Sequence, residues 1–324
     1  MVVQEANQKM LAVFEEKSKR IFAELRKDVI GQNEVVEYTV LAIIAGGNVL
    51  LEGAPGLGKT RLVRSLGRVF DLPFSRIQFT PDVLPSDITG FNMYQMQTGE
   101  QVFHAGSIHN QIILADEINR ASPKTQSALL EAMQERQVTV DGVTYQLPKP
   151  FMVLATQNPV EMAGTYPLPE AQMDRFLMRI RMGYPTHDEE MDIVRSHRSA
   201  IDTVTVKPVA SVEDILTIQS FLPRVHIDDA VISYIVQIVE ATRTAEGVLM
   251  GVSPRGSIAL TQAASAMAIL SGRTYVLPDD VKAMAECVLA HRIVMKNRSG
   301  AQGTTASDII ADILKSLRVP KVRG

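Results

Sequence analysis

The spacing of apolar residues predicts helices in the first part of the chain. Over residues 1 to about 27, apolar side chains recur on one stripe of a helix, between lysine and glutamate residues. The stripe consists of Met10, Leu11, Phe14, Ile21, Phe22 and Leu25. We expect this N-terminal segment, residues 1–28, to pack on the core of the fold. A second helix is predicted from Glu34 to about Ala45.

Five short apolar runs have the length of buried strands, and helical patterns separate them. The runs are residues 49–51, 74–79, 111–115, 151–156 and 176–182, with helices expected from Lys59 to about Phe70 and over 123–135. Strands that alternate with helices form a parallel sheet covered on both faces. The sequence therefore predicts an α/β domain over residues 29–187, built on a five-stranded parallel sheet.

Two hairpins are predicted within this domain. Residues 91–103 form the first, which turns at Thr98-Gly99. Residues 137–146 form the second, because Asp-Gly between alternating apolar residues favours a two-residue turn. Its register pairs Val140 with Val143 and Val138 with Tyr145 on one face, and Thr139 with Thr144 on the other.

After Gly183-Tyr-Pro185 the pattern becomes helical only. Candidate helices cover residues 211–222, 228–245, 254–271, 278–291 and 305–318. Amphipathic helices of this number and length are typical of a small bundle. We therefore expect an all-helical second domain over residues 188–324.

Composition and charge narrow the possible functions. The chain has 324 residues, 46% hydrophobic and 21% charged, with a net charge of −3 and a pI near 6.1. No global basic field indicates nucleic acid. Cys287 is the only cysteine, which excludes an internal disulfide and a cysteine metal site. Without a signal-peptide pattern or an apolar run that could span a bilayer, we expect a cytoplasmic protein with no membrane insertion.

The chemistry centres on a glycine loop between the first strand and the next helix. It fits the pattern G-x-x-x-x-G-K-[ST] in full, with Gly53, Ala54, Pro55, Gly56, Leu57, Gly58, Lys59 and Thr60. Such a loop brings backbone N–H groups and a helix N-terminus to phosphate oxygens. Lys59 can reach the β- and γ-phosphates of ATP, and the Thr60 hydroxyl can ligate Mg²⁺. We expect Arg61 to extend this site, and Ile30 and Gly31 to flank the adenine. A chance glycine loop is the alternative, and its flanking strand and helix disfavour it.

Acidic and amide residues follow the next two inner strands. Asp116 and Glu117 end the run 111–115, where ligands gather in open α/β sheets. Asp116 is the candidate Mg²⁺ ligand, and Glu117 the candidate for polarising the attacking water. Asn158 follows the run 151–156 and can bond the γ-phosphate or that water, although asparagine also starts ordinary turns.

Three arginines are candidates for stabilising phosphate charge. Ser253-Pro-Arg255 has the composition of a helix start, which places Arg255 at a helix N-terminus in the second domain. Arg175 precedes the last strand and is the first candidate for an arginine finger inserted into a neighbouring subunit. Arg120 is the second candidate. Each of the three could instead be a solvated or salt-bridged surface arginine.

Six stretches together resemble the MoxR family of AAA+ ATPases over nearly the whole chain. They are the phosphate loop 53–60, Phe79-Thr-Pro-Asp-Val-Leu-Pro-Ser-Asp-Ile-Thr-Gly90, Asp116-Glu-Ile-Asn-Arg-Ala121, Ala155-Thr-Gln-Asn-Pro159, Tyr166-Pro-Leu-Pro-Glu-Ala-Gln-Met-Asp-Arg-Phe176 and Gly251-Val-Ser-Pro-Arg255. The second and fifth are specific to this family.

The resemblance implies an AAA+ core with a helical lid, assembled into a ring that is usually a hexamer. It makes Lys59 and Thr60 the Walker A residues and Asp116 and Glu117 the Walker B pair. Asn158 becomes sensor 1, Arg255 sensor 2, and Arg175 the arginine finger. The two hairpins match insertions of this AAA+ clade.

The resemblance further implies a chaperone-like motor driven by ATP hydrolysis. Such motors act with a separate von Willebrand factor A domain protein to remodel client complexes or insert metals. A nucleic-acid translocase is an alternative, because related rings include helicases. The hairpin 137–146, however, contains no Lys or Arg to hold phosphates, with Arg136 alone beside it. A slow nucleotide-dependent binding switch is a third possibility.

Overall fold

The computed structural model describes residues 2–158, 164–198, 206–296 and 304–321. The chain divides into two compact units. One consists of residues 21–168 and 180–216, and we call it the α/β unit. The other consists of residues 1–20, 169–179 and 217–324, and we call it the helical unit. The functional boundaries expected from the sequence stay predictions.

The α/β unit is built on a five-stranded sheet in the order β2-β5-β8-β1-β9. The strands are β1 (Val49–Glu52), β2 (Phe74–Gln78), β5 (Ile112–Asp116), β8 (Met152–Gln157) and β9 (Met178–Arg181). The pairs β2–β5, β5–β8 and β1–β8 are parallel. All five predicted strands are therefore confirmed. Because parallel strands end at one edge, residues 116 and 157 come close together beside the loop after β1.

The inner strands are buried because both faces of the sheet carry helices. The helices of this unit include α2 (Asn33–Ile44), α3 (Lys59–Val69), α5 (Pro123–Glu135) and α7 (His187–Arg198). Leu50, Leu114 and Leu154, on three adjacent strands, are fully buried. The buried Asn48 side chain accepts a hydrogen bond from the Val153 N–H at 2.9 Å, which holds β1 in register with β8.

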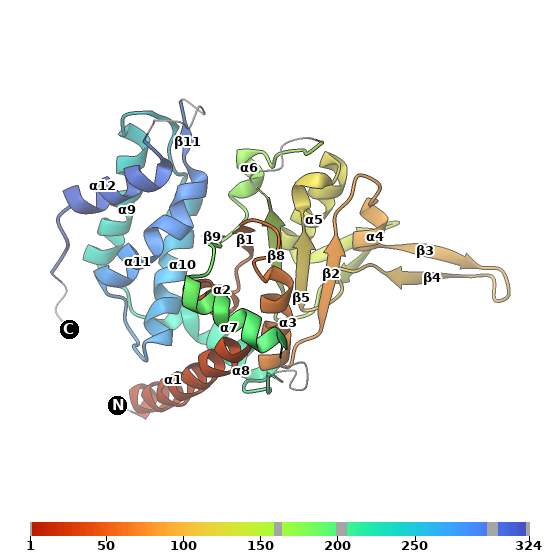
Figure 1. Ribbon diagram of the computed structural model, residues 1–324, viewed down its shortest axis with the longest axis horizontal. Helices are drawn as coiled ribbons and strands as arrows, with labels where there is room; N and C mark the ends of the chain where they lie inside the picture. Colours follow the sequence, from red (N-terminus) through yellow and green to blue (C-terminus); the bar gives the residue numbers. More distant parts are fainter. Residues whose placement is uncertain (1, 159–163, 199–205, 297–303, 322–324) are drawn as a thin grey trace. The chain divides into compact units, whose positions relative to one another are not determined.

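Both predicted hairpins form. The first is β3 (Gly90–Gln95) with β4 (Glu100–Ala105), preceded by a short helix, α4 (Pro85–Thr89), that the sequence pattern did not predict. The second is β6 (Gln137–Val140) with β7 (Val143–Gln146), in the predicted register. Its turn residues Asp141 and Gly142 both have positive φ, as a two-residue turn of this type requires. Figure 1 shows β3 and β4 reaching away from the sheet of the α/β unit.

The helical unit contains four longer helices near the C-terminus. They are α9 (Asp229–Thr244), α10 (Pro254–Leu270), α11 (Pro278–Leu289) and α12 (Ala306–Ser316), and α8 (Val212–Phe221) leads into them. Small residues let α10 lie close to α11, since Ala263, Ala264 and Ala268 are fully buried. The short helix α6 (Glu170–Met173) also belongs to this unit, close to the 3₁₀ turn η3 (Ala290–Arg292).

The prediction that the chain is only helical after residue 188 was wrong. Strands β10 (Val248–Met250) and β11 (Val294–Met295) form a two-stranded antiparallel sheet within the helical unit. Runs of three and two residues are too short to show an alternating pattern, so sequence periodicity cannot detect them.

The N-terminal helix α1 (Val2–Asp28) confirms the predicted apolar stripe. Leu11 and Phe14 are buried in the helical unit, and Ile21 and Leu25 are buried in the α/β unit.

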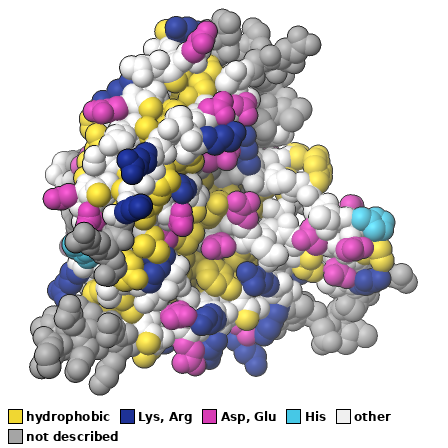
Figure 2. All heavy atoms as spheres, turned by 90° about the vertical axis from the view of Figure 1, so that its left-hand side faces the viewer, with side chains coloured by type: hydrophobic (Ala, Val, Ile, Leu, Met, Phe, Trp, Pro, Cys, Tyr) yellow, Lys and Arg dark blue, Asp and Glu magenta, His cyan; other side chains and the backbone are white. Residues whose placement is uncertain are grey.

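None of the helices in the described part of the chain combines the length and hydrophobicity that a bilayer crossing needs. Figure 2 shows basic and acidic side chains interspersed over the face that it presents.

Candidate nucleotide-binding site

The glycine loop connects β1 to the N-terminus of α3. Gly56 and Gly58 both have φ of +86°, a left-handed conformation that side chains disfavour. A Cβ atom added at either position would meet nothing within 4 Å, so the loop is open beside both glycines. Lys59 and Thr60 form the first turn of α3, whose N–H groups have no partner within the helix. This geometry suits an anion.

Lys59 lies close to the acids at the end of β5. Its Nζ donates a hydrogen bond to the Gly53 carbonyl at 2.5 Å. Burial lowers the pKa of Lys59, and the carboxylates of Asp116 and Glu117 oppose that shift. The two acids thus favour the charged ammonium, and a cation beside two acids is what phosphate and metal binding at one site requires.

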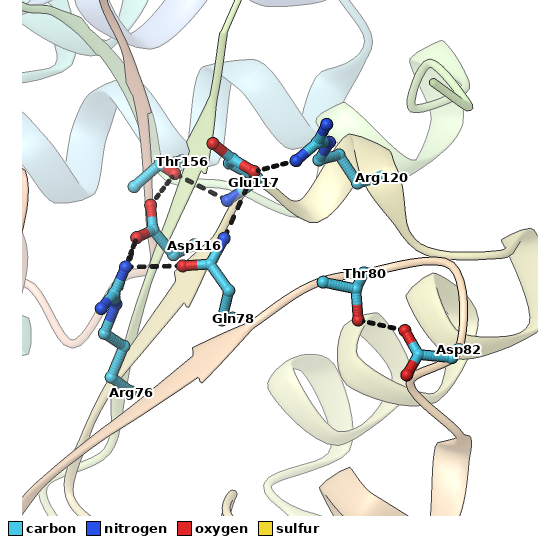
Figure 3. Close-up of polar contacts among 8 residues, drawn as sticks. All are labelled: Arg76, Gln78, Thr80, Asp82, Asp116, Glu117, Arg120 and Thr156. Carbon is cyan, nitrogen blue, oxygen red and sulfur yellow. Dashed lines mark hydrogen bonds and ion pairs between the residues drawn. The ribbon is translucent and has the colours of Figure 1, made fainter. Parts of the chain in front are cut away.

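Asp116 is held by two neighbouring strands, as Figure 3 shows. Arg76 on β2 donates to its Oδ2 through Nη2 at 2.6 Å and Nε at 3.2 Å. Thr156 on β8 donates its hydroxyl to Oδ1 at 2.7 Å. The same hydroxyl accepts the Glu117 N–H at 2.9 Å. Thr156 thereby fixes the positions of both acids.

Glu117 has a left-handed backbone, with φ of +58°. For a residue other than glycine this conformation costs of order 1 kcal/mol, and such residues cluster at functional sites. Its Oε2 accepts from Gln78 Nε2 at 3.2 Å and from Arg120 Nη1 at 3.1 Å. Arg76 Nη2 also donates to Gln78 Oε1 at 2.5 Å. Arg76 and Gln78 therefore link Asp116 to Glu117 through a series of hydrogen bonds (Figure 3).

The residues at this edge fit a nucleotide with a hard divalent cation. Asp116 supplies carboxylate oxygens and Thr60 a hydroxyl, which are ligands that Mg²⁺ prefers. Among the described residues, no cluster of three or more His, Cys, Asp or Glu side chains could hold a metal by itself. A cation here would need phosphate oxygens or water to complete its shell, as Mg²⁺ bound with a nucleotide does.

The remaining predicted residues of the α/β unit include Arg61, Ile30 and Gly31. Arg61 forms an ion pair with Asp28 at 2.8 Å, and the buried Asp28 also accepts from Ser65. This contact joins the end of α1 to α3. Ile30 is half-buried, and Gly31 has φ of +72° in the turn that follows.

Arg175 and Arg255 both belong to the helical unit. Arg175 lies in the turn between α6 and β9, and Arg255 lies in the first turn of α10. Ser253 is the N-cap of α10, as predicted, but its side chain makes no capping hydrogen bond. Arg255 Nη1 lies 3.7 Å from Asp174 Oδ2. Asn158 directly follows β8, two residues after Thr156.

Sequence reasoning missed four side chains of the α/β site: Asp28, Arg76, Gln78 and Thr156. Arg76 and Gln78 occupy alternate positions of β2 and are both exposed. Two long polar side chains on one face of the strand, with the buried Ile77 between them on the other face, were a detectable signal. Their partners were not detectable from the sequence, because β2 and β5 are far apart in the chain and pair only in the folded structure.

Comparison with known proteins identifies the family. The model of the ATPase family associated with various cellular activities (AAA) matches residues 48–178, and the AAA lid domain matches residues 240–313. Chaperone MoxR1 of Mycobacterium tuberculosis is 40% identical over 94% of this chain and 83% of its own. The chain belongs to the MoxR family of AAA+ ATPases.

Further relatives of this MoxR-family ATPase extend over nearly its full length. The uncharacterized protein YeaC of Bacillus subtilis is 48% identical over 93% of this chain and 94% of its own. The crystal structure of a candidate ATPase from Cytophaga hutchinsonii superposes with a TM-score of 0.91 at 40% identity, covering 99% of this chain and 100% of that one. The predicted family and fold class are therefore confirmed.

Proposed function

We propose that this chain binds and hydrolyses ATP at the edge of the sheet formed by β1, β5 and β8. The observation that carries the proposal is the position of an open glycine loop, with Gly56 and Gly58 at φ of +86°, at the same sheet edge as Asp116 and Glu117, which the Thr156 hydroxyl holds in place. A phosphate-binding cation beside one metal-ligating acid and one water-activating acid is the arrangement that nucleotide hydrolysis needs.

Each residue has a separate role in this proposal. The loop from Gly53 to Thr60 binds the phosphates through its N–H groups and Lys59. Thr60 and Asp116 hold Mg²⁺, which when bound supplies the positive charge that neutralises phosphate oxygens. Glu117 accepts the proton of the attacking water. Its hydrogen bonds to Gln78 and Arg120 keep it oriented before it meets that water.

Hydrolysis also requires an amide and two cations from outside the loop. We assign Asn158 to the γ-phosphate or the water, and Arg255 to the γ-phosphate bound by its own subunit. Arg175 is the finger that enters a neighbouring subunit's site, so hydrolysis depends on a ring, which we propose to be a hexamer.

The work performed is remodelling or activation of a protein complex, with metal insertion as one form of it. The name of the relative Chaperone MoxR1 supports this role. We propose that a separate von Willebrand factor A domain protein presents the client. The β3–β4 hairpin offers exposed apolar side chains for such a contact, among them Phe91, Met93, Tyr94 and Met96.

A nucleic-acid translocase is the second candidate, and the surroundings of Arg136 disfavour it. Arg136 directly precedes the hairpin β6–β7, which itself contains no Lys or Arg, and it is turned inward. It donates to the Gly46 carbonyl at 2.7 Å and to the Phe151 carbonyl, and burial lowers its pKa. A guanidinium engaged in this way does not serve a phosphate backbone. A slow nucleotide-dependent switch would be indicated instead by a low turnover that no partner changes.

The experiment that tests the proposal compares wild type with three variants for ATP binding and for phosphate release. Wild type should bind and hydrolyse ATP, Lys59→Ala should not bind it, and Glu117→Gln should bind it but hydrolyse at least about 100-fold more slowly. Lys124→Ala, an exposed lysine on α5, is the control. Near-normal hydrolysis by Glu117→Gln would contradict the assignment.

Glu117→Gln then serves as a trap for the client. Proteins retained from lysate with ATP but not with ADP are identified by mass spectrometry. A von Willebrand factor A domain protein among them supports the chaperone role, and nuclease-sensitive nucleic acid supports a translocase.

A further inference from the structure

Arg292 is a buried cation at the end of η3, in the helical unit. Only 3% of its side chain is exposed, and burial lowers its pKa while Asp174 opposes that shift. A buried guanidinium is tolerated only where its N–H groups are paired. Arg292 Nε donates to Asp174 Oδ1 at 2.7 Å, and Nη1 donates to His291 Nε2 at 2.9 Å and to the Val288 carbonyl.

The other partners of Arg292 are backbone carbonyls on both sides of Arg175. Nη2 donates to the Phe176 carbonyl at 2.6 Å and to the Asp174 carbonyl at 3.2 Å, and Nη1 donates to the Leu177 carbonyl at 3.2 Å. The turn that carries Arg175 is therefore fixed to η3 by one side chain. This agrees with the membership of residues 169–179 in the helical unit.

Asp174 is shared between two cations. Its Oδ1 contacts Arg292 at 2.7 Å, whereas its Oδ2 lies 3.7 Å from Arg255. The Arg255 side chain is 51% exposed. The first contact is short and buried. The second is long and half-exposed, and pairs of that kind contribute little, so they exchange easily.

We propose that Arg292 and Asp174 are positioning residues that join Arg255 to the turn carrying Arg175. Arg292 holds the turn permanently. Asp174 pairs with Arg255 until Arg255 contacts the phosphate of ATP. The Asp174 carboxylate, which belongs to the residue before Arg175, then loses one of its two cations. ATP in one subunit thereby affects the arginine offered to the next. This inference rests on the proposed roles of Arg175 and Arg255.

The experiment uses mixtures of two full-length variants. The acceptor carries Arg175→Ala, so that it can hydrolyse ATP only with a neighbour's arginine. The donor carries Glu117→Gln, so that it supplies the arginine without hydrolysing. Asp174→Asn or Arg292→Lys is then added to the donor. Phosphate release by the mixture, ATP affinity of the donor alone and its thermal unfolding are measured.

The two donor variants should behave differently. Asp174→Asn should lower the kcat of the mixture at least about fivefold, a common size for coupling between sites, with the acceptor's KM unchanged. The Kd of this donor variant for ATP should fall about twofold to threefold, because Arg255 no longer pairs with a carboxylate. Loss of an exposed ion pair changes a binding constant by about that factor. Arg292→Lys keeps the charge but loses the planar fork, so it should lower kcat and leave the Kd unchanged.

Asp280→Asn in the donor is the matched control. Asp280 is a buried acid of the same unit that pairs with Arg273 at 2.6 Å, away from the turn of Arg175. It should lower the unfolding temperature as Asp174→Asn does, while the mixture keeps its full rate. A full rate with both donor variants, or weaker ATP binding by Asp174→Asn, would overturn the inference. If the parent donor fails to activate the acceptor, the proposed finger is wrong, and the Kd comparison still tests the exchange at Asp174.

Discussion

Arg76, on the edge strand β2, is hydrogen-bonded to the acids at the end of β5. It donates directly to one carboxylate oxygen of Asp116. It also donates to Gln78, which in turn donates to Glu117 and orients it. A cation in that position neutralises Asp116 in the absence of metal. If Asp116 ligates Mg²⁺ as proposed, the guanidinium competes with the metal for the same oxygen.

We therefore predict that Arg76→Met changes the metal dependence of nucleotide binding. Without the guanidinium, Asp116 Oδ2 is available, and the Mg²⁺ concentration for half-maximal binding of a fluorescent ATP analogue should fall about threefold to tenfold, which reflects loss of a charged hydrogen bond. Arg181→Met is the control, because Arg181 lies on the opposite edge strand and 3.8 Å from Glu52. Equal Mg²⁺ dependence in both variants would exclude competition at Asp116.

We expect His291 to make the stability of the fold sensitive to acid. Desolvation, and then the charges of Arg292 and Arg179, lower its pKa well below the usual value of 6.5. Arg292 can only donate, so Nε2 of His291 accepts and the ring is neutral. Nε2 therefore cannot also donate to the Phe176 carbonyl, 3.3 Å away.

The sign of the effect follows from linkage. Below about pH 6.5 the unfolded chain protonates this histidine and the folded chain does not. The contribution of the neutral His291 to the free energy of unfolding is therefore present above that pH. It is lost as the pH falls, at up to about 1.4 kcal/mol per pH unit. We predict that His291→Gln flattens the decline in the free energy of unfolding between pH 6.5 and 5, measured by urea denaturation. His187→Gln, on exposed α7, should leave the decline unchanged.

At the scale of elements, the two hairpins depend on each other. Phe103 on β4 stacks on Tyr145 of β7 with ring centroids 3.8 Å apart, and Asn92 donates to Asp141 at 2.9 Å. The base of the first hairpin is closed by Gly106, where a Cβ atom would lie 2.1 Å from the Ile88 carbonyl oxygen. Only glycine fits that position without moving the backbone.

Gly106→Ala should therefore disrupt the β3–β4 hairpin. The clash is with backbone, so relief requires local rearrangement that costs roughly 2 kcal/mol or more. Limited proteolysis within residues 90–105 should accelerate, and retention of client by the Glu117→Gln trap should fall. ATP affinity should not change. Gly183→Ala is the control, since a Cβ atom there meets nothing within 4 Å, and equal cleavage of the two variants would contradict this reading.

At the scale of the whole molecule, the residues assigned to hydrolysis are divided between the two units. Lys59, Asp116, Glu117 and Asn158 belong to the α/β unit, and Arg175 and Arg255 belong to the helical unit. MoxR-family AAA+ proteins are typically oligomeric. If Arg175 acts on a neighbouring subunit, hydrolysis per subunit must depend on assembly.

We predict that the specific ATPase activity of the wild type rises with protein concentration and reaches a plateau. Light scattering should show a ring at the same concentrations. Arg175→Ala should assemble and bind ATP but lose activity by about 1,000-fold or more, the usual effect of removing an arginine finger. Arg120→Ala is the comparison. If Arg120→Ala loses more ATPase activity than Arg175→Ala, Arg120 is the arginine finger.

Local order was largely predictable from the sequence. The five strands, the hairpin register at Val138, Thr139 and Val140, and the phosphate loop follow from periodicity, from Asp-Gly turn chemistry and from a spaced motif. Each depends on residues close together in the chain. The short strands β10 and β11 were missed because their few residues carry no periodic signal.

Residue type and spacing specify which chemical groups a loop or strand end can offer, so these groups could be identified from the sequence. Which of the groups meet depends on the tertiary fold. Arg76 pairs with Asp116 across β2 and β5, and Arg292 holds the turn of Arg175 across more than a hundred residues of chain. Such contacts are set by the packing of buried strands and helices, where an unpaired charge costs too much free energy to persist.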